Sequence, residues 1–402
     1  MRTKYFLLLL CLIGVSCTTS EEKISRKAER MHDSFLSIDT HSDTPMRLTR
    51  GGGFDPGIRN DRGCVDFPRM KEGRLDAEFF AIFLGQGPRT PEAFEKVHMQ
   101  TLATFDSIYA TLARNSSMAA IALTPEDAQR NKEQGKVSVF IGIENGYPLG
   151  NDLSRIKQYY DLGSRYITLC HSSNNDICDS STDKTGPEHN GLSAFGEEVV
   201  REMNRVGMMA DVSHISDESF YDVLAVSKAP VIASHSSCRA LCESPRNLDD
   251  EMLQALKKNG GVIQICILSD YLRQPEPNPA YEEKAKALRE KWSAMGELTD
   301  EQQEQRWAEY SALRQEYVRL ATVEDAVNHI EHVVDVIGID YVGIGTDFDG
   351  GGGLQDCPDV SMMKNITKEL IRRGYSRDEI AKIWGGNFSR VMREAQSLAV
   401  SQ

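Results

Sequence analysis

The sequence predicts an α/β protein in which most of the 402 residues form one (β/α)8 (TIM) barrel, with a helical insertion between the seventh and eighth strands. Two observations predict this fold: eight short apolar segments, and amphipathic segments between most of them. The predicted strands are 35–38, 79–84, 137–143, 166–169, 208–212, 231–233, 262–267 and 341–344. Near-continuous apolar strands indicate a parallel sheet covered by helices, and eight strand–helix units favour a closed barrel over an open sheet.

Helical periodicity fills the gaps between most of the strands. Residues 193–206 have this pattern and are followed by Gly207 as a stop, and the same pattern recurs at 249–258 and 322–336. A closing helical region is predicted at 376–396. The barrel domain is therefore expected to span residues 35–396.

The N-terminus is predicted to lie outside the barrel. Residues 1–16 have the pattern of a secretory signal peptide, because Arg2 and Lys4 precede an apolar stretch at 6–15 that is too short to span a bilayer. The stretch ending at Cys17 resembles a bacterial lipoprotein signal, which would make Cys17 the lipidated first residue of the mature protein, although Gly14 is atypical three positions before it. Residues 17–34 would then be the lipidated cysteine and a tether.

These N-terminal features predict an exported protein of a bacterial cell envelope, in the periplasm or at the outer membrane. A lipid anchor on Cys17 would hold it at a membrane, and plain secretion is the alternative.

Charge and cysteine content limit the partners. The formal net charge of −14 argues against a nucleic-acid partner, because neutralising phosphates needs a basic surface. Seven of the nine cysteines lie beyond Cys17, so they cannot all pair within the chain. Their spacing shows no disulfide framework of a small secreted scaffold.

One long segment does not fit a minimal barrel. Residues 275–320 are rich in Glu, Lys, Arg and Gln and contain few β-forming residues. This composition predicts inserted helices between the seventh and eighth strands. A solvated helical hairpin is the favoured interpretation, and a lid or a subunit contact is the alternative.

Metal-ligating residue types gather at the ends of the predicted strands. His41 and Asp43 follow the first strand and, in an extended segment, residues two apart project to the same face. The later strand ends supply Glu144, His171, His214, His235, Asp347 and Asp349. Active sites of such barrels form at the C-terminal ends of the strands, so these side chains are expected to converge. The other histidines, at positions 32, 98, 189, 329 and 332, lack this placement and are predicted to be ordinary surface or helix residues.

Such a set of histidines and carboxylates suits two divalent cations. Nitrogen and oxygen ligands are typical of zinc, and a carboxylate can bridge two ions. Two ions about 3.5–4 Å apart can hold a bridging hydroxide and polarise a carbonyl, which favours hydrolysis of an amide. Taken singly, each residue could instead cap a turn or bond to the backbone.

The sequence resembles the membrane (renal) dipeptidase family of metallopeptidases from about residue 35 to 395. The strings that carry the resemblance are Ile38-Asp39-Thr40-His41-Ser42-Asp43, Gly142-Ile143-Glu144, Leu169-Cys170-His171, Gly191-Leu192, Phe195-Gly196, Met203-Asn204, Asp211-Val212-Ser213-His214, Ser234-His235-Ser236, Arg246-Asn247, Gly345-Thr346-Asp347-Phe348-Asp349-Gly350 and Gly386-Asn387-Phe388. In this order and spacing the set is highly specific.

The resemblance implies two Zn²⁺ ions per chain and a role for each matching residue. His41 and Asp43 would bind one zinc ion, His214 and His235 the other, and Glu144 would bridge them. His171 would stabilise the oxyanion, Arg246 would bind the substrate's terminal carboxylate and Asp347 would transfer the proton to the leaving amine. Asp349 would support this geometry. The family also implies a homodimer.

The expected function is therefore hydrolysis of dipeptides, including some with a D-residue at the C-terminus, by a zinc-dependent enzyme of the metal-dependent hydrolase type. A related amidohydrolase acting on acyl-amino acids, cyclic amides or lactones is the alternative. A non-catalytic surface lipoprotein is disfavoured because all five ligands are present with His171 and Asp347. The sequence departs from the family pattern at Asn145-Gly146, at Thr346 and in the insertion at 275–320.

Overall fold

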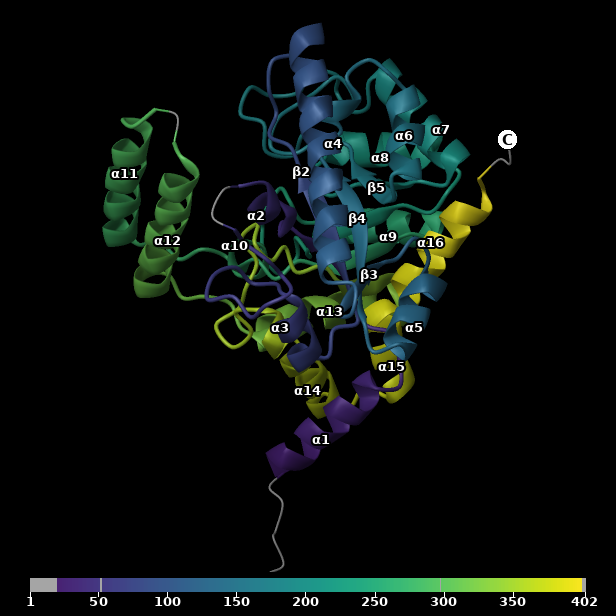
Figure 1. Ribbon diagram of the computed structural model, residues 1–402, viewed down its shortest axis with the longest axis vertical. Helices are drawn as coiled ribbons and strands as arrows, with labels where there is room; N and C mark the ends of the chain where they lie inside the picture. The colour runs from purple at the N-terminus through teal and green to yellow at the C-terminus, as the bar shows by residue number, and fades with distance from the viewer. Residues whose placement is uncertain (1–19, 51–52, 297, 400–402) are drawn as a thin grey trace, which may run out of the picture.

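Eight parallel strands follow one another around a barrel, and helical segments connect most successive strands (Figure 1). The structure is a computed structural model that describes residues 20–50, 53–296 and 298–399. The strands in ring order are β1 (Ile38–Ser42), β2 (Ala77–Phe83), β4 (Val137–Glu144), β5 (Ser164–Thr168), β6 (Met209–Asp211), β7 (Ile232–Ser236), β8 (Val262–Ile265) and β9 (Val342–Ile344). The predicted (β/α)8 architecture is confirmed.

A further strand, β3 (Ala119–Ile121), lies outside this ring. It pairs in parallel with the first residues of β4, whereas β5 pairs with the later residues of the same strand. The segment Ala-Ala-Ile is too short and too weakly apolar to give a periodic signal, so the sequence pattern does not predict it.

The ring closes between its last and first strands. The backbone N–H of Asp347 donates to the carbonyl of His41 at 3.0 Å, and the N–H of Asp43 donates to the carbonyl of Phe348 at 2.8 Å. These bonds lie just after β9 and at the end of β1. Closure therefore joins the segments that carry two groups of predicted site residues.

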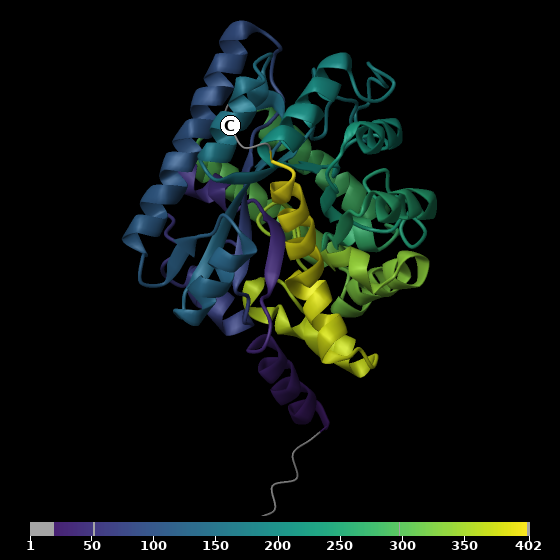
Figure 2. The same cartoon turned by 90° about the vertical axis from the view of Figure 1, so that its right-hand side faces the viewer.

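Helices surround the ring of strands (Figures 1 and 2). Their bounds are α1 (Ser20–His32), α2 (Pro45–Thr49), α3 (Phe67–Gly73), α4 (Pro91–Arg114), α5 (Pro125–Glu133), α6 (Ser154–Asp161), α7 (Ala194–Val206), α8 (Asp217–Val226), α9 (Asp250–Asn259), α10 (Ser269–Leu272), α11 (Pro279–Ser293), α12 (Asp300–Tyr317), α13 (Val323–Ile337), α14 (Lys364–Arg372), α15 (Arg377–Ala381) and α16 (Asn387–Ser397). Short helical turns lie at Tyr147–Leu149, Ile339–Tyr341, Val360–Met362 and Lys382–Gly386.

Capping residues set the ends of the predicted helices. The Ser193 side chain accepts a hydrogen bond from the Gly196 N–H at the start of α7, and Gly207 ends that helix in a left-handed conformation with φ 84°. Thr322 and Asp325 form a reciprocal capping box at the start of α13. The helical segments expected from periodicity are thus present.

Apolar side chains from successive strands pack together within the ring. Ile38, Phe79, Phe140, Tyr166, Met209, Ile232 and Val262 form one cluster with Phe388, Val391 and Met392 of α16. The rings of Phe79 and Phe140 stack at 4.8 Å, and Phe388 meets Phe79 edge-on at 5.2 Å. Because most of the strand residues lie in the first halves of their strands, α16 covers the N-terminal end of the barrel. The C-terminal end of the barrel is therefore the end available for a functional site.

The N-terminal helix α1 replaces most of the predicted tether. It packs against α14 (Figure 1). The imidazole Nε2 of His32 lies 2.7 Å from the Thr367 hydroxyl. The chain is therefore folded from Ser20, earlier than the sequence predicts. The predicted signal peptide and Cys17 lie outside the described residues. Among the helices of the described part, none is long and apolar enough to cross a membrane.

The insertion forms a hairpin of α11 and α12, which stands beside the barrel on the left of Figure 1. The guanidinium of Arg314 in α12 donates to both carboxylate oxygens of Asp270 in α10, at 2.8 and 2.9 Å. The amide of Asn278 donates to the carbonyl of Tyr317 at 2.8 Å and joins the two ends of the hairpin. The segment is thus helical, as predicted, and is fixed to the barrel at its base.

Candidate metal centre

The predicted ligands converge at the C-terminal end of the barrel. His41 and Asp43 lie at the end of β1, Glu144 ends β4, His171 follows β5, His214 follows β6, His235 lies in β7 and Asp347 follows β9. All of these residues are buried except His171, which is partly exposed. The structure therefore brings together all the residues that the sequence assigns to the metals and to proton transfer.

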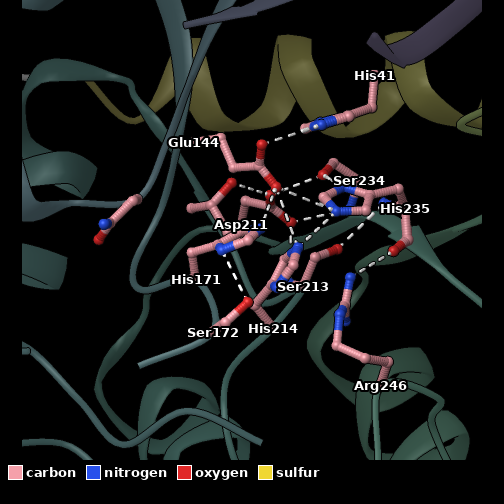
Figure 3. Close-up of polar contacts among 12 residues, drawn as sticks. His41, Glu144, His171, Ser172, Asp211, Ser213, His214, Ser234, His235 and Arg246 are labelled. Atoms are coloured by element: carbon pink, nitrogen blue, oxygen red, sulfur yellow. Dashed lines mark hydrogen bonds and ion pairs between the residues drawn. The ribbon is translucent and has the colours of Figure 1, made fainter. Parts of the chain in front are cut away.

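Glu144 lies at the centre of the group, between four imidazoles (Figure 3). Its Oε2 is 3.5 Å from His41 Nε2. Its Oε1 is 3.0 Å from His214 Nε2, 3.4 Å from His235 Nε2 and 3.6 Å from His171 Nε2. One carboxylate oxygen thus faces the β1 side and the other faces the β6–β7 side, as a bridging ligand requires.

The donor atoms form three overlapping groups that could hold cations. They are His41 with Glu144 and His235, Glu144 with His171 and His214, and His41 with Asp43 and Asp347, with ligand atoms within 4.8 Å of one another in each group. His41 Nε2, Asp43 Oδ1 and Glu144 Oε2 are buried without a hydrogen-bond partner in the described protein. Buried polar atoms are normally satisfied, so these atoms fit a cation between them.

A tyrosine fixes the orientation of His41. The Tyr166 hydroxyl donates to the Thr40 carbonyl at 3.2 Å and lies 2.9 Å from His41 Nδ1. Its oxygen therefore accepts from Nδ1–H, which leaves the lone pair of Nε2 facing Glu144 and Asp43. This is the neutral tautomer that binds a metal through Nε2.

A comparable relay fixes His235. The Ser234 hydroxyl donates to Asp211 Oδ2 at 2.7 Å and lies 2.8 Å from His235 Nδ1. The serine oxygen thus accepts from Nδ1–H, which leaves the lone pair of Nε2 facing Glu144 Oε1 and His214 Nε2. Asp211 is itself held by the Ser213 and Ser234 backbone N–H groups and by the Thr168 hydroxyl.

The electrostatics favour bound cations. Burial lowers the pKa values of His214 and His235 well below the usual range, so both imidazoles are neutral at pH 7. Burial also opposes protonation of His41, but the Glu144 and Asp43 carboxylates outweigh it and raise the His41 pKa to about 10. The neighbouring His41 and His171 hold the Glu144 pKa well below its usual range despite its burial. The same negative charge that would hold a proton on His41 would hold a metal ion.

Two residues of the three ligand groups have strained backbones. His214 has φ 74° and Asp347 has φ 60°, in the left-handed region that non-glycine residues rarely adopt. Such conformations cost about 1–3 kcal/mol and are retained where the surroundings impose them.

Burial and the Glu144 carboxylate raise the pKa of Asp347 to about 7, while His41 and Arg246 oppose the rise.

Asp349 lies in the same loop but outside the ligand groups. Its Oδ2 accepts from the Thr44 hydroxyl at 2.8 Å, and its Oδ1 accepts from Arg47 Nε and from the Cys64 N–H, both at 2.9 Å. These contacts tie the loop after β9 to the segments that follow β1.

Arg246 faces a cavity of about 640 Å³ above the centre. The cavity is also lined by Glu144, His171, His214, His235, Tyr271 and Asp347. The guanidinium is buried, donates to the His235 carbonyl at 3.0 Å and lies 5.2 Å from the centre of the Tyr271 ring. No carboxylate among the described residues forms an ion pair with it, and its Nε has no partner there. This is a suitable environment for an anionic group of a ligand.

The sequence did not assign roles to the residues that orient the ligands. Tyr166 and Asp211 lie within predicted strands, and Ser234 lies next to a predicted ligand. The sequence signal that could have pointed to Tyr166 and Asp211 was a polar residue within an otherwise apolar strand. Asp39 was also missed: it accepts from the Thr346 N–H at 2.8 Å and from the Thr346 hydroxyl at 2.5 Å.

Three histidines outside the site lie in helices, which agrees with their prediction as surface or helix residues, and they are buried: His32, His98 and His329. His329 Nδ1 accepts from the Cys238 N–H and its Nε2 donates to the Leu272 carbonyl, each at 3.0 Å. Both ring nitrogens are therefore satisfied only in the neutral form, and burial lowers the pKa of His329 to about 4. These contacts indicate a structural role for His329.

Comparison with known proteins gives consistent matches over nearly the whole chain. Residues 25–402 match the family model described as membrane dipeptidase (peptidase family M19). Dipeptidase tcpJ of Claviceps purpurea is 35% identical over 346 residues, which cover 85% of this chain and 71% of that protein. Dipeptidase verJ of Clonostachys rogersoniana is 33% identical over 396 residues, covering 94% and 89%.

Solved structures agree with this assignment. The probable dipeptidase PvdM from Pseudomonas aeruginosa superimposes with a TM-score of 0.81 at 33% identity, covering 94% of this chain and 99% of that chain. A metallopeptidase from Rhodobacter sphaeroides shares the fold, with a TM-score of 0.73 at 23% identity, covering 90% of this chain and 99% of that chain. The chain therefore belongs to the membrane dipeptidase family, peptidase family M19, and is a metal-dependent dipeptidase of that family.

Proposed function

We propose that the enzyme binds two Zn²⁺ ions and hydrolyses dipeptides that carry a free C-terminal carboxylate. The position of Glu144 is the observation that carries this proposal. Its two oxygens face different sets of imidazoles, and the buried guanidinium of Arg246 faces the same cavity. A centre for two cations and a site for an anionic group thus lie within one space.

Two ligand sets that share Glu144 are proposed. His41 and Asp43 would hold one ion and His214 and His235 the other; the Nε2 atoms of His214 and His235 lie 2.8 Å apart and both face Glu144 Oε1. The unpartnered atoms of His41, Asp43 and Glu144 support the first set. The neutral imidazoles of His214 and His235 support the second. When bound, the two ions would supply Lewis acidity that activates a water molecule and polarises the peptide carbonyl.

His171 is placed to stabilise charge on the substrate. Its side chain is 27% exposed, and the cavity reaches it. The Ser172 hydroxyl lies 2.9 Å from Nδ1 and can donate to it, which puts the ring proton on Nε2, the side that faces Glu144. A donor fixed there would stabilise the oxyanion that develops on the peptide carbonyl.

Asp347 would move the proton. Its carboxylate groups with His41 and Asp43 and also lines the cavity. From this position it can accept a proton from the attacking water and deliver it to the leaving amine. Arg246 would bind the terminal carboxylate and so place the peptide bond over the metal ligands.

A D-residue at the C-terminus is part of the proposal. The related Rhodobacter sphaeroides metallopeptidase was crystallised with a phosphinate mimic of the dipeptide L-Ala-D-Ala. For the present chain the stereochemistry is a question for the assay, and L,L- and L,D-dipeptides are the natural pair of probes.

The cellular context is also proposed. The basic residues and apolar stretch before Cys17 support export to a bacterial cell envelope and lipidation of Cys17, which would attach the enzyme to a membrane. Detergent partitioning of the wild type and of Cys17→Ser tests this, and equal partitioning would contradict the anchor. A homodimer is proposed from the family, and light scattering of the purified protein measures it.

The decisive test of the activity uses protein whose metal content has been measured. We expect about two zinc ions per chain and hydrolysis of L-Ala-L-Ala or L-Ala-D-Ala that stops with chelator and returns with added zinc. A protein with two bound metals and no chelator-sensitive cleavage of any dipeptide would refute the proposed function and leave the fold unaffected.

A further inference from the structure

The insertion helix α12 contributes side chains to the mouth of the barrel. Gln303, Arg306 and Trp307 are spaced so that they share one face of the helix. All three line a hollow of about 220 Å³. Trp307 is 43% exposed, so much of its ring is open to solvent. The hairpin therefore forms part of a wall near the candidate centre.

This hollow adjoins the catalytic cavity. Asp43, His171 and Gly350 line both spaces. On the far side, Trp307 and Gly350 also line a third space of about 390 Å³ between α12 and the glycine-rich loop after β9. Trp307 thus lies where the hairpin meets the spaces around the catalytic residues.

Apolar and basic side chains line the hollow together with the Asp43 and Asp349 carboxylates. Phe83, Met46 and Trp307 supply apolar surface, and the Phe83 ring lies 4.7 Å from the His171 ring. Arg306 is exposed, and Arg47 on the opposite wall is paired with Asp349. Aromatic rings and guanidinium groups together form surfaces on which another aromatic ring can pack.

The hollow and Arg246 lie on opposite sides of the barrel mouth. Phe83 ends β2, whereas Arg246 follows β7, and three strands separate β2 from β7 in either direction around the ring. A dipeptide whose carboxylate binds Arg246 must extend across the metal ligands toward β1 and β2. Its amino-terminal residue then faces the hollow.

We propose that this hollow is a subsite for an aromatic side chain on the amino-terminal residue of the dipeptide, and that Trp307 determines this preference. The inference rests on the proposed dipeptidase function. The hairpin, which the barrel does not need for its own closure, thereby acts in substrate selection. Arg306 would pack along the bound ring through its guanidinium plane.

The test compares dipeptides that differ only in the amino-terminal side chain. We expect the zinc-loaded full-length enzyme to have a higher kcat/KM for L-Phe-L-Ala than for L-Ala-L-Ala. In Trp307→Ala the ratio of the two kcat/KM values should fall by about tenfold, which corresponds to the free energy of one lost contact between aromatic rings. Trp307→Phe should keep most of the ratio.

A matched control lies on the same hairpin. Met295 is a large apolar residue, 47% exposed, and it lines none of the three spaces around the barrel mouth. Met295→Ala should leave the Phe/Ala ratio at the wild-type value, with metal content and circular dichroism equal in all variants. An unchanged ratio in Trp307→Ala would overturn the proposal. A wild-type preference for L-Glu-L-Ala that disappears in Arg306→Gln would overturn it as well.

Failure of the dipeptidase proposal can be separated from failure of the subsite. If no dipeptide is cleaved, calorimetry of the same zinc-loaded proteins measures binding of L-Phe-L-Ala and L-Ala-L-Ala directly. Tighter binding of L-Phe-L-Ala that is lost in Trp307→Ala supports the subsite in that case, and equal affinities overturn it.

Discussion

Replacement of Arg246 by alanine tests the proposed recognition of the substrate carboxylate. The guanidinium is 4% exposed and has no acidic partner in the described chain, so a bound carboxylate would form its first ion pair. Each hydrogen bond to a charged group contributes about 1.5–3 kcal/mol, and two such bonds at about 1.5–2 kcal/mol each together contribute about 3–4 kcal/mol. We therefore expect Arg246→Ala to lower kcat/KM on a dipeptide by roughly 100- to 1,000-fold.

The assay compares each dipeptide with its C-terminal amide. The wild type should prefer the free acid strongly, and Arg246→Ala should lose most of that preference because the missing charge is the one that distinguishes the two substrates. Arg239 provides a matched control: it lies in the same connection between β7 and α9, pairs with Asp217 at 2.7 Å and does not line the cavity. Arg239→Ala should retain the preference. An equal loss of activity on acid and amide in Arg246→Ala would refute the reasoning.

Three further predictions concern the residues around the ligands. Tyr166→Phe removes the acceptor of His41 Nδ1–H and should weaken metal binding by about 10- to 100-fold, measured by competition with a chromophoric chelator; unchanged affinity would contradict the orienting role. Gly142→Ala places a methyl group 2.1 Å from the Tyr166 ring and should cost about 1–3 kcal/mol of stability in denaturant unfolding, whereas wild-type stability would contradict the close approach. The His329 pKa is about 4 when folded and about 6.5 when unfolded, so only the unfolded state gains a proton there as pH falls through this window. The free energy of unfolding should therefore decrease between pH 7 and pH 5. This decrease should be about 2 kcal/mol smaller in His329→Gln than in the wild type, and equal decreases would count against this assignment.

The order of the eight barrel strands could be predicted because most of them are apolar runs between amphipathic segments. The predicted strand bounds were wrong for β1, which carries residues of the site. The first strand was expected at 35–38 but extends over Ile38–Ser42, because its buried polar residues find partners across the ring. Thr40, for example, donates to the Ser234 carbonyl at 2.8 Å. Local hydrophobicity cannot reveal partners that are 194 residues away.

The ligands could be predicted because each lies at a strand end, where position along the chain also gives position in the barrel. The orientation of their side chains could not be predicted. The pairing of Tyr166 with His41 depends on two strands that meet across the interior of the ring, and no local pattern specifies it. The contribution of Trp307 was also hidden, because the weakly amphipathic sequence of α12 does not show which face meets the barrel.

Closure of the barrel and assembly of the centre depend on the same few contacts. His41 and Asp347 come from opposite ends of the domain, yet the Asp347 N–H donates to the His41 carbonyl at 3.0 Å. Asp39 strengthens this seam, since it accepts from both the backbone and the hydroxyl of Thr346, the residue directly before Asp347. The carboxylate proposed to move protons is thus held against a proposed metal ligand by backbone bonds that also close the ring. A change that opened this seam would displace Asp347 from His41 before it disturbed His214, which faces the other carboxylate oxygen of Glu144.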